Sequence, residues 1–258
     1  MAKPAINNDW SLLPGLSGNS WRPRTQQDEI HRLTPLQPLP FVNRQREYRI
    51  LRKLRGARLG SKAKGFAAGE LRVEWTQGRT LAPSDFSPEN TELIALLIRL
   101  HQHPLLGYRL PLVTLLQRYW QLCRQRHPGW LSELQRLQRR GEPHPLRLVP
   151  LHMDLHPGNV ITTDTGLVLI DWEYSADGDI ALELATLCLQ DADQATAWIT
   201  AYAQAFSLDT ETLRIQVKRW QPWLRLLQAS WYQLKAEQTQ QPLMKQLATQ
   251  SWQTLLSS

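Results

Sequence analysis

The sequence predicts an α+β fold with two lobes, a small mixed lobe over residues 1–80 and a larger, mainly helical lobe over residues 81–258. Three observations lead to this prediction. Short strand-like runs and turn residues dominate the first 80 residues, and apolar residues recur at helical spacing from about residue 87 onward. A pattern typical of a β-hairpin interrupts the predicted helices between residues 159 and 171.

The elements of the first lobe follow from local chemistry. Residues 13–21, Leu-Pro-Gly-Leu-Ser-Gly-Asn-Ser-Trp, predict a loop, because proline, glycine and small polar residues favour turns. Strands are predicted at Glu29–Leu33 and Leu71–Thr76. Between them, apolar residues recur at helical spacing over residues 43–55, which predicts a helix whose arginines lie on the opposite, solvated face.

The second lobe is predicted to begin with a helix at Ser87 and Pro88, because serine is a good N-cap and proline suits the first helical position. The further elements predicted along the chain are helices at 112–125 and 130–140, hairpin strands at 159–162 and 167–171, and a helix that begins at Asp179 or Ile180. Most of the 11 tryptophans are predicted to be core residues of these helices.

The composition is that of a globular protein, with 42% hydrophobic and 21% charged residues. The net charge of +7 raises the possibility of nucleic-acid binding, but no zinc, helix-turn-helix or RNA-recognition motif accompanies the basic residues. We therefore expect no nucleic-acid partner. The same positive charge is also compatible with attraction of a small polyanion such as ATP.

Targeting signals and reactive cysteines are not expected. The longest apolar run, Leu93–Ile98, is too short to span a bilayer, and the first ten residues lack the apolar segment of a signal peptide. Cys123 and Cys188 lack metal-ligand spacing and are predicted to be buried thiols in a reducing compartment. We expect a cytoplasmic protein with no membrane association and no obligate protein partner.

The residues that carry chemistry lie in His152-Met-Asp-Leu-His-Pro-Gly-Asn159 and in the strand Leu167-Val-Leu-Ile that ends at Asp171. The spacing H-x-D-x-x-x-x-N with a later strand-end aspartate is typical of phosphoryl transfer from ATP. Asp154 is the predicted catalytic base, and His152 is predicted to support the loop by hydrogen bonds. Asn159 and Asp171 are predicted to bind Mg²⁺, which prefers oxygen ligands.

Each of these residues also has an ordinary interpretation. Taken alone, Asp154 is a turn or capping aspartate and Asn159 a turn asparagine. Because both occur at the spacing of the kinase motif, together with His152 and Asp171, the functional interpretation is favoured. His156 either lines the site or is a satisfied loop histidine, and Asp179 is predicted to cap a helix and brace the catalytic loop.

Other residues are predicted to contact the two substrates. Gly15, Ser17, Gly18, Asn19 and Ser20 form the predicted phosphate-covering loop, because glycine permits close backbone approach and the polar residues offer donors. Arg32 is predicted to pair with the ATP phosphates and Glu47 to hold that cation, although such residues on a charged surface need no function. Trp172, Glu173 and Glu183 are predicted to face a cationic substrate, since aromatic rings and carboxylates recognise cations.

With these motifs in place, the chain resembles the aminoglycoside phosphotransferase/choline kinase superfamily and, within it, the bacterial thiamine kinases. The matching segments are Gly15–Gly18, Arg147–His156, Gly166–Tyr174, Asp177–Ala185 and Arg219–Leu224. The resemblance implies a protein-kinase-like two-lobe fold with a nucleotide-binding lobe at 1–80 and a catalytic and substrate-binding lobe at 81–258. It also implies ATP- and Mg²⁺-dependent phosphorylation of the thiamine hydroxyl to thiamine monophosphate in vitamin salvage, with Asp154 as the base.

Two alternatives remain open. In the first, the chain is another small-molecule kinase, which acts on choline, ethanolamine or an aminoglycoside. In the second, it is a kinase-like binding module without catalytic activity. Few acidic clusters in the helical lobe disfavour a polyamine substrate, and none of Asp154, Asn159 and Asp171 is lost, which disfavours a silent module. The chain departs from protein kinases where Trp-Glu follows Asp171 and where Arg32 replaces a lysine.

Overall fold

The computed structural model describes residues 10–13, 20–24, 28–37 and 39–256. The chain divides into two compact units. The first, here the sheet unit, comprises residues 1–106 and 154–175, and the second, here the helical unit, comprises residues 107–153 and 176–258. The predicted lobe boundary near residue 80 therefore falls inside the sheet unit, which also contains Asp154, Asn159 and Asp171.

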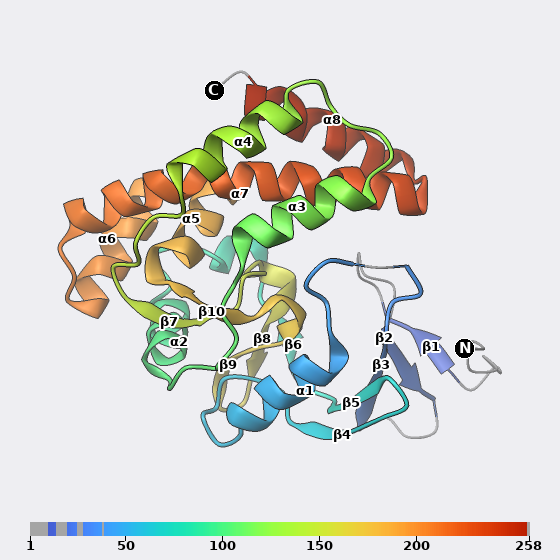
Figure 1. Cartoon of the computed structure of the whole chain (residues 1–258). Helices are drawn as coiled ribbons and strands as arrows, with labels where there is room; N and C mark the ends of the chain where they lie inside the picture. The colour runs from blue at the N-terminus through green and yellow to red at the C-terminus, as the bar shows by residue number, and fades with distance from the viewer. Residues whose placement is uncertain (1–9, 14–19, 25–27, 38, 257–258) are drawn as a thin grey trace. The chain divides into compact units, whose positions relative to one another are not determined.

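The sheet unit is built on a five-stranded antiparallel sheet with strand order β1-β2-β3-β5-β4 (Figure 1). The strands are β1 (Trp10–Leu12), β2 (Ser20–Pro23), β3 (Glu29–Leu33), β4 (Ala63–Ala67) and β5 (Glu70–Glu74). Two of them confirm the predicted strands, β3 with the same ends and β5 displaced by one or two residues. Helix α1 (Arg44–Lys53) packs against β4 and β5.

Helix α1 follows from its cap and its apolar face. The side chain of Asn43 accepts a hydrogen bond from the backbone N–H of Arg46 at 2.8 Å, and Ile50 and Leu51 are buried. The expectation that the arginines of this segment are solvated is wrong for Arg44, which is only 2% exposed. The carboxylates of Glu47, one turn further along α1, and of Glu173 pair with its guanidinium and permit its burial.

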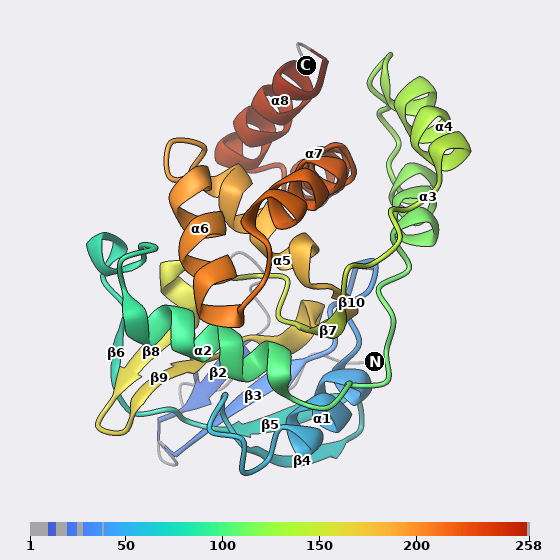
Figure 2. The ribbon, with the colours of Figure 1, turned by 90° about the vertical axis from the view of Figure 1, so that its left-hand side faces the viewer.

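The rest of the sheet unit supports the predicted hairpin. Strands β6 (Arg79–Thr80), β8 (Val160–Thr163) and β9 (Gly166–Leu169) form an antiparallel sheet in the order β6-β8-β9, and helix α2 (Thr91–Gln102) lies against β9 (Figure 2). Short 3₁₀ turns occupy Pro83–Asp85, Pro157–Asn159 and Trp172–Tyr174. The hairpin prediction is confirmed.

The predicted start of α2 is wrong by one turn. The N-cap is Asn90, whose side chain accepts hydrogen bonds from the N–H groups of Glu92 and Leu93 at 3.1 Å each. Ser87 instead belongs to the preceding turn, where its carbonyl accepts the N–H of Asn90 at 3.1 Å. Serine and asparagine are comparable caps, so local preference alone does not choose between them.

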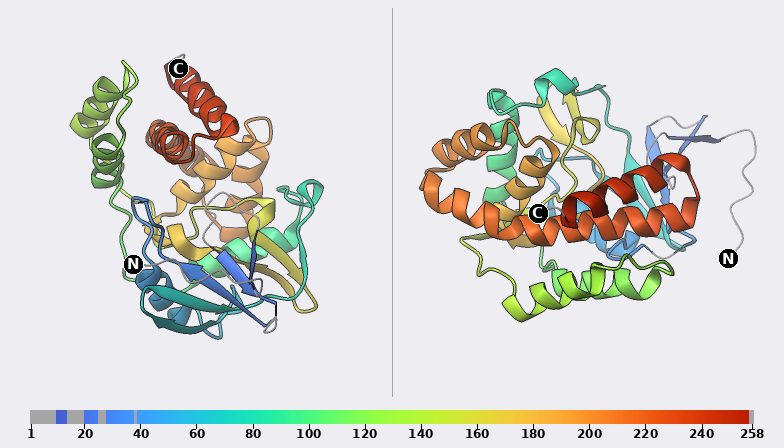
Figure 3. Two further views of the ribbon diagram at one scale, coloured as in Figure 1. Left: turned by 90° about the vertical axis from the view of Figure 1, so that its right-hand side faces the viewer. Right: turned by 90° about the horizontal axis from the view of Figure 1, so that it is seen from above.

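The helical unit is organised around one long helix. Its elements are α3 (Leu112–Leu122), α4 (Trp130–Arg140), β7 (Leu148–Leu151), β10 (Ala176–Asp179), α5 (Ile180–Gln190), α6 (Ala195–Phe206), α7 (Thr210–Thr239) and α8 (Pro242–Leu256). Strands β7 and β10 pair antiparallel, and α7 contacts each of the other helices of the unit (Figure 3). Although α7 has 30 residues, neither it nor another helix in the described ranges is apolar enough to cross a membrane.

The core of the helical unit contains the aromatic residues and thiols that the sequence places on helices. Trp130, Trp198 and Trp223 are at most 2% exposed, which confirms the core prediction for these tryptophans. Cys123 and Cys188 are buried and not bonded to each other. Burial raises the pKa of Cys123 to about 12 and that of Cys188 to about 11, so both remain thiols rather than reactive thiolates near neutral pH.

Gly60 allows a close approach at the end of the hairpin. It forms a parallel bridge to Leu169, and a Cβ atom there would lie 2.5 Å from the indole nitrogen of Trp172 and 2.6 Å from the Leu169 carbonyl oxygen. We expect Gly60→Ala to lower the free energy of unfolding by about 1–3 kcal/mol, because the backbone and a buried ring must shift. Urea unfolding of the purified protein measures this loss.

Gly65→Ala is the matched control. Its new Cβ meets only the flexible tip of Arg72, at 2.9 Å, and we expect stability near that of the wild type. Equal losses in the two variants would contradict the steric explanation.

Candidate active site

The segment that carries Asp154 begins at the end of β7, where a buried carboxylate fixes its backbone. The N–H groups of His152 and Met153 donate to the two oxygens of Glu183 on α5, at 2.5 and 2.8 Å. Met153 has a φ of 66°, a conformation that non-glycine residues rarely adopt without support. The backbone of His152 is thus held in place, whereas the supporting role predicted for its side chain stays a prediction. The prediction that Glu183 faces a substrate is wrong, because it is fully buried.

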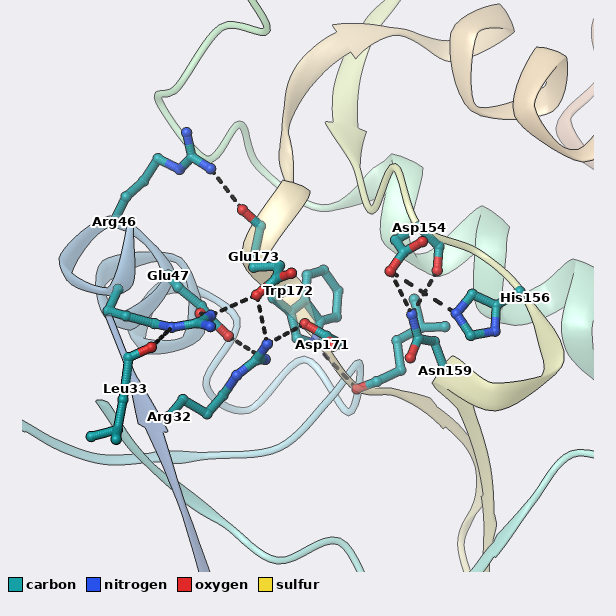
Figure 4. Close-up of polar contacts among 12 residues, drawn as sticks. Arg32, Leu33, Arg46, Glu47, Asp154, His156, Asn159, Asp171, Trp172 and Glu173 are labelled. Carbon is teal, nitrogen blue, oxygen red and sulfur yellow. Dashed lines mark hydrogen bonds and ion pairs between the residues drawn. The ribbon is translucent and has the colours of Figure 1, made fainter. Parts of the chain in front are cut away.

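Asn159 positions the predicted base. Its side-chain nitrogen donates to both the carbonyl oxygen and the carboxylate Oδ2 of Asp154, each at 2.9 Å (Figure 4). Asn159 is 6% exposed, whereas the Asp154 side chain is 37% exposed. The carboxylate is therefore oriented from inside the unit and remains accessible to a hydroxyl group from outside, which is what a general base requires.

The hairpin brings Asp171 beside Asn159. Val160 pairs with Leu169, and the next residue, Ile170, donates its N–H to the Asn159 carbonyl at 3.0 Å. Asp171 follows directly, with a left-handed backbone (φ 65°, ψ 66°) that ends the strand. In Figure 4 its carboxylate lies between the Asp154–Asn159 pair and a group of arginines. The structure thus brings together the three residues that the motif predicts.

Asn159 and Asp171 suit a magnesium ion that is coordinated partly by protein oxygens and partly by phosphate oxygens. In the described part of the chain no donor bonds the side-chain oxygen of Asn159, and the Asp171 carboxylate adds a charged oxygen ligand. No group of three or more His, Cys, Asp and Glu side chains among these residues forms a complete metal site. Mg²⁺ is commonly held by one or two protein oxygens together with substrate phosphates, and this donor set matches that pattern.

Asp171 belongs to a largely buried cluster of five charged side chains. This arginine–carboxylate cluster consists of Arg32, Arg44, Glu47, Asp171 and Glu173, and Figure 4 labels all of them except Arg44. Arg32 pairs with Glu47 at 2.6 Å, with Glu173 at 2.9 Å and with Asp171. Arg44 pairs with Glu47 and Glu173, both at 2.7 Å. Four of the five side chains are at most 7% exposed, the exception being Asp171 at 28%.

Charge balance holds this cluster together. Burial alone lowers the pKa of Arg32, but the carboxylates of Glu47, Asp171 and Glu173 outweigh it and raise the pKa overall. Burial, followed by the Asp171 charge, raises the pKa of Glu173, while the two arginines act in the opposite direction. Two cations and three carboxylates leave one negative charge in excess, which suits a site that receives a cation at Asp171.

The remaining sequence predictions have mixed outcomes. The predicted contact between Arg32 and Glu47 is present. Gly15, Ser17, Gly18 and Asn19 lie outside the described residues, and Ser20 begins β2, where it pairs with Arg32 across the sheet. The nucleotide contacts of all these residues stay predictions.

Trp172 and Glu173 have internal partners. The Trp172 ring is 1% exposed, and its N–H donates to the Leu169 carbonyl at 3.1 Å. Glu173 is 3% exposed, its carboxylate binds the two cluster arginines, and its carbonyl accepts from Arg46 at 2.7 Å. These positions give the predicted substrate contacts no support.

Two buried aspartates brace the helical unit. Asp179 caps α5, as predicted, and also accepts hydrogen bonds from Gln216 at 2.6 Å and Trp220 at 2.7 Å on α7. Asp177, which sequence reasoning missed, accepts the N–H groups of Gly107 and Tyr108 at 2.6 and 3.0 Å. The sequence Asp-Gly-Asp before an apolar helix could have indicated this role for Asp177, since the spacing of two places both acids on the same face of a strand.

Arg44 was missed as well. Arg44 lies three residues before Glu47 on α1, a spacing that indicates an ion pair. The same spacing is equally typical of an ion pair on a solvated helix face, so it does not predict burial.

Comparison with known proteins identifies the family of this chain. Residues 12–216 match the family described as "Phosphotransferase enzyme family". The chain is 42% identical over 212 residues to the thiamine kinases of Salmonella paratyphi C and Salmonella typhimurium, a match that covers 81% of this chain and 76% of each relative.

Solved structures show the same fold. The choline kinase LicA of Streptococcus pneumoniae superimposes with a TM-score of 0.77 at 20% identity, over 96% of this chain and 92% of that one. A choline/ethanolamine kinase family protein from Mesorhizobium loti gives 0.71 at 20% identity, over 98% and 88%. At such identities the likeness concerns the fold alone, and it confirms the predicted kinase-like architecture.

Proposed function

We propose that this chain, which belongs to the phosphotransferase enzyme family, transfers a phosphoryl group from ATP to the hydroxyl group of thiamine and releases thiamine monophosphate. The observation that carries the chemistry is the convergence of Asp154, Asn159 and Asp171 at one end of the hairpin. The choice of thiamine is supported by the 42% identity to proteins named thiamine kinases. We place the reaction in thiamine salvage in the cytoplasm.

In this mechanism Asp154 orients the thiamine hydroxyl and accepts its proton as the new P–O bond forms. Asn159 fixes the carboxylate of Asp154 through Oδ2, at 2.9 Å, so the base needs no reorientation during the reaction. The oxygen of Asn159 and the carboxylate of Asp171 would hold Mg²⁺, which when bound neutralises charge on the phosphates. Arg32 and Glu47, together with Gly15, Ser17, Gly18, Asn19 and Ser20, stay the proposed nucleotide-side residues.

Substrate choice is tested by ADP release with ATP and Mg²⁺ over thiamine, choline, ethanolamine, kanamycin and homoserine. We expect the highest kcat/KM with thiamine. The choline and ethanolamine arms test the alternative suggested by the fold of the similar solved structures. Turnover of another alcohol without turnover of thiamine would show that the substrate assignment is wrong.

The proposed metal site predicts a changed magnesium requirement in Asp171→Asn. The variant keeps the size of the side chain and loses its charge. We expect the Mg²⁺ concentration for half-maximal activity to rise at least about tenfold, a loss typical even for residues that only support a metal ligand. Initial rates at saturating thiamine over a Mg²⁺ titration measure this shift.

Asp164→Asn, at the exposed hairpin turn, is the control for this titration and should keep the wild-type magnesium requirement. An unchanged requirement in Asp171→Asn as well would remove Asp171 from the metal site.

A further inference from the structure

His156 lies beside Asp154, the base of the proposed reaction. Its Nε2 atom is 4.0 Å from Oδ2 of Asp154, and Figure 4 shows the ring beside Asp154 and Asn159. The side chain is 44% exposed, so a substrate can contact it.

The loop determines which nitrogen of the ring carries the proton. The N–H of Gly158 donates to Nδ1 of His156 at 3.1 Å, so Nδ1 is an acceptor and the proton of the neutral ring is on Nε2. A glycine is needed for this contact, because a Cβ at residue 158 would lie 2.8 Å from the ring carbon Cε1. Burial lowers the pKa of His156 against the opposing effect of Asp171, which favours the neutral ring. Nε2 therefore presents an N–H donor on the side of Asp154.

The reaction path runs close to this donor. In the proposed function the phosphoryl group begins near the magnesium ligands Asn159 and Asp171 and ends on a hydroxyl held by Asp154. The imidazole of His156, 4.0 Å from the carboxylate of Asp154 and beside Asn159, adjoins this path. Fixed N–H donors aimed at developing negative charge are among the strongest contributors to catalysis, because they need no reorganisation during the reaction.

We propose that the Nε2–H group of His156 donates a hydrogen bond to the phosphoryl group during transfer, which makes His156 a further catalytic residue. The inference rests on the proposed function. The bond from phosphorus to the ADP oxygen breaks, the bond to the acceptor oxygen forms, and the acceptor proton passes to Asp154. His156 neither gains nor loses a proton in this step.

Two substitutions separate the donor from the turn that positions it. In His156→Asn the side-chain oxygen can still accept the Gly158 N–H, as asparagine does in turns, but no donor remains at the Nε2 position. In His156→Gln the amide nitrogen reaches the Nε2 position. We expect kcat to fall on the order of 10²-fold in His156→Asn, as for loss of one transition-state donor, with KM for ATP and for thiamine within about twofold of wild type. His156→Gln should recover part of that loss.

His144→Asn is the matched control, because His144 is exposed in the helical unit, and we expect wild-type kinetics. A kcat for His156→Asn within about threefold of wild type, or a higher KM with unchanged kcat, would overturn the inference, since each shows that no transition-state contact is lost.

The proposed function fails separately, if the wild-type protein does not turn over thiamine. The same three variants are then compared with whichever alcohol of the panel is phosphorylated, and the same limits apply. A wild-type protein that phosphorylates none of these alcohols overturns both proposals.

Discussion

Replacing Asp154 by asparagine is expected to reduce kcat on the order of 10²-fold or more while leaving the free energy of unfolding close to the wild-type value. The amide has the size of the carboxylate and can still meet the side chain of Asn159, but it cannot accept a proton from the substrate hydroxyl. Stability should change little, because the Asp154 side chain is 37% exposed. ADP release with thiamine and urea unfolding measure the two quantities.

Asp193→Asn provides the control for this prediction, since it removes an exposed carboxylate between α5 and α6. Both its kcat and its stability should match the wild type. A kcat for Asp154→Asn within a few-fold of the control would exclude Asp154 as the base. A large loss of stability would instead assign it a structural role.

Replacing Glu183 by alanine is expected to cost about 3 kcal/mol or more of stability and to lower kcat as well. Two buried N–H groups, those of His152 and Met153, lose their acceptor, and each unsatisfied buried donor costs about 1–3 kcal/mol. Met153 also loses the support for its left-handed backbone, directly before Asp154. Glu183→Gln keeps one acceptor oxygen and should fall between alanine and wild type in both measurements.

Glu237 offers a matched comparison within the same unit. Its carboxylate also accepts two backbone N–H groups, from Arg124 at 2.8 Å and Gln125 at 2.9 Å, but the residue is only half-buried and both hydrogen bonds are exposed, so water can replace the carboxylate. We therefore expect Glu237→Ala to lose about 1 kcal/mol or less and to retain wild-type kcat. Equal losses for Glu183→Ala and Glu237→Ala would show that burial does not strengthen the contact at Glu183.

Much of the candidate site could be predicted because its geometry is local. Asn159 and Asp171 flank one hairpin, so the alternation and turn signals that predict the hairpin also predict that the two residues meet. The pair of Arg32 and Glu47 joins a strand to the next helix along the chain. It was predicted by analogy with protein kinases, in which a strand cation pairs with a glutamate on the following helix.

The parts that escaped prediction depend on distant partners. Arg44 has the sequence context of a solvated helix residue, and one of the two carboxylates that pair with it in the interior, Glu173, lies 129 residues later. Glu183 follows Trp172 and Glu173 closely in the sequence, which suggested a substrate pocket, whereas its partners are backbone N–H groups, which no side-chain pattern reveals. The cap of α2 was predicted at Ser87 instead of Asn90 because these two good capping residues are only three positions apart.

The division of the chain into units has a consequence for biosynthesis. The polypeptide passes between the units three times, at residues 106–107, 153–154 and 175–176. Arg32 is synthesised 139 residues before Asp171, so a ribosome that has released only the first strands holds a sheet whose buried arginine still lacks two of its three carboxylates. An unpaired buried charge is costly. Completion of the sheet unit therefore waits until residue 175 has left the exit tunnel, and until then the nascent N-terminal segment remains incompletely folded.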